Sequence, residues 1–130
     1  MSRIKICGLR RPEDIAAVNE ARPDYCGFIV EYPKSRRSID RATLRELVRG
    51  LREEIVPVGV FVNAPKELVA ELLEEGTIQI AQLHGQESQE YIQELKVLTE
   101  KPLIQAFSIK SKEDVERARE SAADYILLDQ

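Results

Sequence analysis

The sequence lacks the features of a membrane, secreted or disulfide-linked protein. No segment approaches the ~18 consecutive apolar residues that cross a bilayer, and the start of the chain has neither the apolar run nor the cleavage site of a signal peptide. Only two cysteines are present, Cys7 and Cys26, and they fall in different apolar segments. Because lasting disulfides are uncommon inside cells, we expect two free thiols in a cytoplasmic protein without membrane contact.

An excess of positive charge is also missing. The chain has 19 Lys and Arg against 23 Asp and Glu, a net charge of −4, and its basic residues are scattered except at Arg10–Arg11 and Arg36–Arg37. A nucleic-acid partner is therefore not expected. The sequence also has no glycine-rich phosphate loop, no metal-spaced cluster and no dinucleotide fingerprint.

The composition that is present, 43% hydrophobic and 32% charged over 130 residues, is that of one globular domain covering residues 1–130. The apolar pattern alternates between short buried runs and helical spacing. It predicts five helices between six strands, which lie at 3–7, 25–30, 56–62, 78–84, 102–107 and 124–129.

Helix start signals support the same division. Pro12 suits the first position of a helix, Asn63 can cap the helix that follows the third strand, and Ser88 can cap the next. Ser111 and Asp114 have the spacing of a capping box.

Strands that alternate with helices predict parallel pairing and an α/β fold. An open doubly wound sheet and part of a (β/α)8 TIM-type barrel both fit, although six strands and five helices make only about five and a half units of a barrel that needs about 200 residues. The sixth strand has no covering helix after it, which indicates a truncated barrel or a strand at the sheet edge.

Polar residues gather where the predicted strands end, which is where parallel sheets bind ligands. Cys7, Asn63, Gln82, His84 and Asp129 lie at strand ends, and Lys34, Arg36 and Arg37 follow the second strand. Side-chain alternation puts Lys5 with Cys7 on the face opposite Ile4 and Ile6, and Gln82 with His84 on one face.

Each of these residues also has a structural reading. Cys7 can be a buried packing residue, His84 can bond a backbone group in its turn, and Asp129 can cap a helix. Arg36 and Arg37 are either a solvated pair or an anion site, since an arginine fork matches a carboxylate or phosphate. The residues alone therefore indicate an α/β scaffold with an anion-sized site.

Five motifs, in this order and spacing, closely resemble the phosphoribosylanthranilate isomerase family of tryptophan biosynthesis over all 130 residues. They are KICGLRRPED, CGFIV with YPKSRRSI, VGVFVN, QLHGQES and ILLD. The resemblance implies a TIM barrel and an Amadori rearrangement of N-(5-phosphoribosyl)anthranilate to 1-(2-carboxyphenylamino)-1-deoxyribulose 5-phosphate, without metal or organic cofactor.

The resemblance also assigns roles. It implies that Cys7 is the general base, that Asp129 is the general acid, and that Arg37, in preference to Arg36, meets the anthranilate part of the phosphorylated substrate. Gln82 and His84 receive supporting, substrate-binding roles. His84 is the only histidine, so a histidine base has no second candidate.

The chain departs from the family after the sixth strand, since the phosphate-binding loops of strands seven and eight have no counterpart. We therefore expect an amino-terminal portion of the enzyme with impaired activity, and exposed strand edges that favour self-association or a missing carboxy-terminal partner segment. The alternative is a non-catalytic α/β binding or assembly module derived from the isomerase.

Overall fold

The computed structural model describes residues 3–129, and the side chains of residues 3–128. Its strands are β1 (Lys5–Cys7), β2 (Tyr25–Val30), β3 (Ser38–Ile39), β4 (Val56–Phe61), β5 (Ile80–Leu83), β6 (Leu103–Ser108) and β7 (Tyr125–Asp129). Its helices are α1 (Pro12–Ala21), α2 (Arg41–Arg49), α3 (Lys66–Glu74), α4 (Gln89–Leu98) and α5 (Lys112–Arg119). None of these helices is long and apolar enough to cross a membrane.

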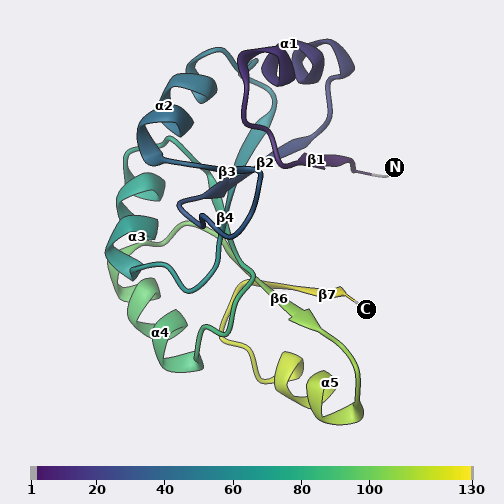
Figure 1. The fold of residues 1–130 in the computed structure, drawn as a ribbon. Coiled ribbons are helices and arrows are strands. Elements are labelled where there is room, and N and C mark those ends of the chain that lie inside the picture. The colour runs from purple at the N-terminus through teal and green to yellow at the C-terminus, as the bar shows by residue number, and fades with distance from the viewer. Residues whose placement is uncertain (1–2, 130) are drawn as a thin grey trace.

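All strand pairs are parallel, in the order β1-β2-β4-β5-β6-β7, and the short β3 pairs only with β2. The sheet curls strongly, with the five helices on its outer side and the edge strands β1 and β7 on either side of its open side (Figure 1). The arrangement is an open part of a parallel (β/α) barrel. This confirms the predicted fold class.

The outer face of the sheet packs against the helices to form the hydrophobic core. Cys26 and Phe28 of β2 are completely buried there, together with Leu44 of α2 and Leu72 of α3. Ile6 packs against the same core from β1. Strand alternation therefore sends the other residues of β1, Lys5 and Cys7, to the inner face.

The inner face is concave and only partly filled. A groove of about 490 Å³ runs along it, and its lining includes Lys5, Tyr25, Val58, Gln82 and Ile104. Most of the lining is apolar, with Arg3, Lys5 and Gln82 as polar exceptions. The groove thus brings residues from six strands, β1, β2 and β4–β7, together on one surface.

Two details of the fold differ from the prediction. The apolar pattern does not predict β3, because its two residues are too few to show a period. Asn63 does not cap α3: the helix begins after Pro65, and the Asn63 side chain instead accepts a hydrogen bond from the Gln86 backbone N–H at 2.9 Å. Ser88 does cap α4, accepting from the Tyr91 N–H at 3.0 Å.

Candidate active site at the carboxyl ends of the strands

Cys7 is the last residue of β1, and its thiol is exposed at the carboxyl end of the strand. The thiol lies over Gly27 of the neighbouring strand: a Cβ added at Gly27 would come within 2.7 Å of the Cys7 Sγ and 3.1 Å of the Lys5 Cε. Gly27 therefore leaves the space that Cys7 and Lys5 occupy on the inner face. The packing interpretation of Cys7 is wrong, because the residue is not in the core.

Arg37 lies against the residue that follows Cys7. Gly8 directly follows Cys7 and has φ +88°, and a Cβ added there would come within 2.7 Å of the Arg37 Cδ and 2.8 Å of its Nη1. Only glycine takes this backbone conformation without strain and also leaves room for the arginine. Cys7 and Arg37, thirty residues apart in the chain, are thus brought to one place.

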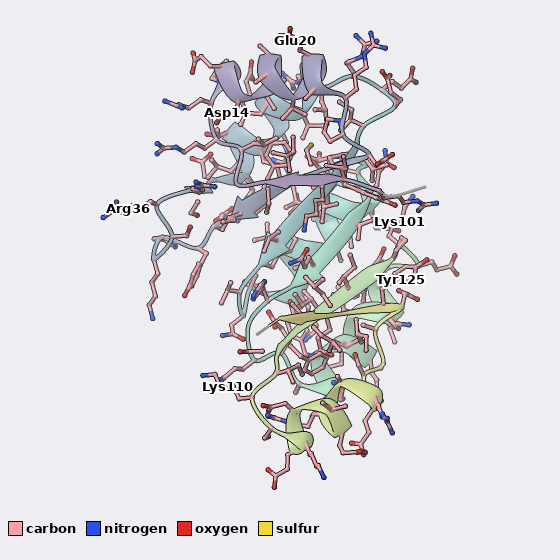
Figure 2. The ribbon with its side chains drawn as sticks, turned by 90° about the vertical axis from the view of Figure 1, so that its right-hand side faces the viewer. Asp14, Glu20, Arg36, Lys101, Lys110 and Tyr125 are labelled. Carbon is pink, nitrogen blue, oxygen red and sulfur yellow. The ribbon has the colours of Figure 1, made fainter. Side chains whose placement is uncertain are left out.

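The loop that carries Arg37 is held by several hydrogen bonds. Its start is fixed by the Tyr32 N–H, which donates to Ser38 Oγ at 2.7 Å, and its end by the Arg37 N–H, which donates to Ser35 Oγ at 3.2 Å. The Arg36 carbonyl accepts from Arg10 Nη1 at 3.3 Å. Figure 2 shows Arg36 at the carboxyl end of the strands, opposite the end that carries Tyr125.

Cys26 has the opposite environment from Cys7. Burial raises the pKa of the Cys26 thiol from 9.0 to about 12, and the nearby Cys7 thiolate charge acts in the same direction. A thiol with so high a pKa is neutral at pH 7 and is neither a nucleophile nor a base. Cys26 is thus a packing residue of the core.

Gln82 and His84 project from the end of β5 toward the same side. The Gln82 side chain is buried on the inner face, where its Oε1 accepts from Lys5 Nζ and its Nε2 lies 3.4 Å from His84 Nδ1. His84 is exposed, and its backbone N–H donates to the Phe61 carbonyl at 2.8 Å. Both residues therefore reach the end of the strands that carries Cys7.

Sequence reasoning missed Glu87, a buried carboxylate in the motif QLHGQES. Its Oε2 accepts from the Asn63 N–H at 2.8 Å and its Oε1 from the Gly85 N–H at 2.9 Å. Glu87 therefore joins the loop after β4 to the loop after β5 and fixes the backbone next to His84. The sequence offers no signal for this, because a glutamate just before a helix cap is normally exposed.

Asp129 ends β7, where its backbone pairs in register with Ser108 of β6. Its side chain lies outside the described residues. Among the side chains that are described, no group of three His, Cys, Asp or Glu residues is placed to hold a metal ion. The chemistry of the described site is thus that of a thiol, a guanidinium, an amide and an imidazole.

A family model described as N-(5'-phosphoribosyl)anthranilate (PRA) isomerase matches residues 4–130. The N-(5'-phosphoribosyl)anthranilate isomerase of Acetivibrio thermocellus is 43% identical over 99% of this chain. The chain spans 61% of that relative's length.

Solved structures show the same likeness. A phosphoribosyl anthranilate isomerase in complex with reduced 1-(o-carboxyphenylamino)-1-deoxyribulose 5-phosphate superposes with a TM-score of 0.84 and is 35% identical, covering 99% of this chain and 65% of that one. The Thermotoga maritima enzyme gives a TM-score of 0.83 at 34% identity, covering 98% of this chain and 61% of its own.

Proposed function

Because the chain belongs to the N-(5'-phosphoribosyl)anthranilate isomerase family, we propose that it acts on N-(5'-phosphoribosyl)anthranilate in cytoplasmic tryptophan biosynthesis. The product is 1-(2-carboxyphenylamino)-1-deoxyribulose 5-phosphate. One observation carries the proposal: the Cys7 thiol is exposed at the carboxyl end of β1, and the Arg37 side chain lies against Gly8, the next residue of the chain. A candidate base and a candidate anion-binding group thus lie at the end of the sheet where parallel strands bind ligands.

The proposed reaction needs one acid and one base. The Asp129 carboxylic acid protonates the furanose ring oxygen, the bond from that oxygen to C1 breaks, and a Schiff base forms. The Cys7 thiolate then removes the C2 proton. The C2–H electron pair forms the C1=C2 double bond and the imine electron pair moves to nitrogen, which gives an enolamine. Transfer of the enol proton to C1 yields the ketone, so C2 is oxidised and C1 reduced within one molecule.

Arg37 binds the substrate's carboxylate in this proposal. Its planar fork can donate two parallel hydrogen bonds to the carboxylate of the anthranilate ring. Gln82 and His84 line the site from β5 as supporting groups. None of these roles uses a metal ion or an organic cofactor.

Loss of the substrate's fluorescence on adding the protein tests the activity. If Cys7 is the base, Cys7→Ser lowers the rate by about 100-fold or more, as does Asp129→Asn for the acid. Cys26→Ala is the matched control, because that thiol faces the core and the variant retains the rate of the unchanged protein. Equal rates for the Cys7 and Cys26 variants would contradict the role given to Cys7.

A second candidate function is a non-catalytic binding module derived from the isomerase. In that case the reduced product analogue binds in an Arg37-dependent way while the substrate's fluorescence stays constant. We further propose that the open edges of the sheet lead to self-association, for which a test is given below.

A further inference from the structure

A hydrogen-bond chain crosses the inner face of the sheet from Lys5 to His84. Lys5 lies on the edge strand β1, three strands away from β5 in the sheet order. On a flat sheet that separation is about 14 Å, but the curl brings the Lys5 Nζ into hydrogen-bond contact with the Gln82 Oε1. The contact thus depends on the curvature of the sheet.

The chemistry of lysine fixes the orientation of the Gln82 amide. A lysine ammonium has three donors and no acceptor, so the amide atom that faces it must be the oxygen. The amide nitrogen, a donor only, is then directed to the other side. Because Gln82 is only 4% exposed, water does not compete freely for these two groups.

The amide orientation in turn selects the state of His84. The Gln82 Nε2 lies 3.4 Å from the His84 Nδ1. An NH₂ group that donates to Nδ1 requires this ring nitrogen to be an acceptor, so the proton of the neutral imidazole resides on Nε2. The ring then presents an N–H donor at its far nitrogen.

We propose that Lys5 is a positioning residue that, through Gln82, holds His84 in the Nε2–H tautomer at the mouth of the site. His84 thereby offers a hydrogen-bond donor, not a base, to an acceptor oxygen of a bound molecule. That last use of the donor rests on the proposed function, whereas the tautomer is a property of the free protein. The assignment of the tautomer can therefore hold even if the proposed function is wrong, and the reverse is also true.

Nitrogen-15 NMR of the imidazole ring tests the tautomer without any turnover. His84 is the only histidine, so a sample labelled at histidine gives one set of ring signals that needs no assignment. At a pH where the ring is neutral, two-bond proton–nitrogen correlations are expected to show the Nε2–H form. A ring in the Nδ1–H form in the unchanged protein would overturn the proposal.

Charge reversal gives the sharper test. In Lys5→Glu the new carboxylate attracts the Gln82 NH₂ group, the amide turns, and its oxygen now faces His84, so the tautomer is expected to change to Nδ1–H. Lys5→Arg keeps a donor and retains the Nε2–H form. Lys112→Glu, the same reversal on the exposed face of α5, is the matched control and also retains it.

Gln82→Glu supplies an independent variant should Lys5→Glu fail to fold. A carboxylate can only accept, so a proton is expected on Nδ1. Backbone amide dispersion checks the fold of each variant. If a folded Lys5→Glu or Gln82→Glu protein keeps the His84 tautomer of the unchanged protein, Lys5 and Gln82 do not set that tautomer.

Discussion

Cys7 and Cys26 lie on adjacent strands but have opposite environments. In the β1–β2 register Cys26 is opposite Ile6, and Cys7 is opposite Gly27, so the two thiols point to different faces of the sheet. One face packs against helices, and the other is the open groove. A difference of one position along a strand therefore separates a core residue from a candidate base.

The two thiols should react differently with iodoacetamide. In the folded protein at pH 8 we expect alkylation of Cys7 only, because Cys26 is fully buried and has its pKa raised to about 12. Both react in urea. Mass spectrometry counts the modified thiols, and Cys7→Ser should leave none reactive without denaturant; native labelling of Cys26 as fast as Cys7 would contradict the assignment.

Three helices, α1, α2 and α5, have at their start an aspartate that accepts hydrogen bonds from backbone N–H groups. Asp14 in α1 and Asp114 in α5 each accept hydrogen bonds from two backbone N–H groups just before the helix. Asp40 caps α2 by accepting from the Thr43 N–H at 2.8 Å. These backbone hydrogen bonds are the leading cause that lowers the pKa of all three carboxyls below the usual 3.8.

These caps predict how stability depends on pH. A carboxyl whose pKa is lower in the folded state adds stability that is complete above its unfolded value of 3.8 and is lost as the pH falls through the folded value. We therefore expect the urea midpoint to fall between pH 5 and pH 2. Asp14→Asn should reduce this dependence, and an unchanged pH profile in that variant would contradict its contribution.

The Glu87 carboxylate links the loop after β4 to the loop after β5. In Glu87→Ala the Asn63 and Gly85 N–H groups lose their acceptor, at a cost of about 1–3 kcal/mol for each N–H left unsatisfied. Glu87→Gln keeps one acceptor oxygen, so its stability should lie between that of the unchanged protein and that of Glu87→Ala. Urea unfolding measures the loss and hydrogen exchange locates it at the two amides; the exposed Glu100→Ala is the control.

At the scale of the whole molecule, the sheet has two open edges. Tyr125, Ile126, Leu127 and Leu128 of β7 are between 43% and 62% exposed, so an apolar strand with unpaired backbone groups faces solvent. Such an edge is a template for pairing with another chain. In the described part of the chain β1 and β7 do not pair with each other, so the sheet is open at this edge and the groove on its inner face is open beside it.

We expect this edge to drive concentration-dependent self-association. Ile126→Lys or Leu128→Lys should shift the protein toward monomer in sedimentation velocity, because a charged side chain on an edge strand opposes pairing. Val97→Lys on α4 is the matched control: it removes an equally apolar exposed residue away from the edge. A monomer at all concentrations, or an equal effect of the Val97 variant, would contradict this role of β7.

Local sequence signals predicted most elements and several site residues. Period and cap signals located all the strands except β3, and helix starts such as Pro12 and Ser88, because these depend on neighbours within a few residues. Strand parity also placed Cys7 correctly on the inner face. The cap at Asn63 was wrong, since that side chain bonds a loop 23 residues further along the chain, which no local pattern reveals.

By itself the sequence determined the alternation of strands and helices, the free state of the thiols and the end of the sheet at which polar residues gather. The tertiary structure alone decided which residues far apart in the chain come into contact. The Lys5–Gln82 contact, the space that Gly8 leaves for Arg37 and the burial of Glu87 all join residues more than 20 positions apart. Such contacts depend on the curl and register of the sheet, which arise from the packing of the whole chain.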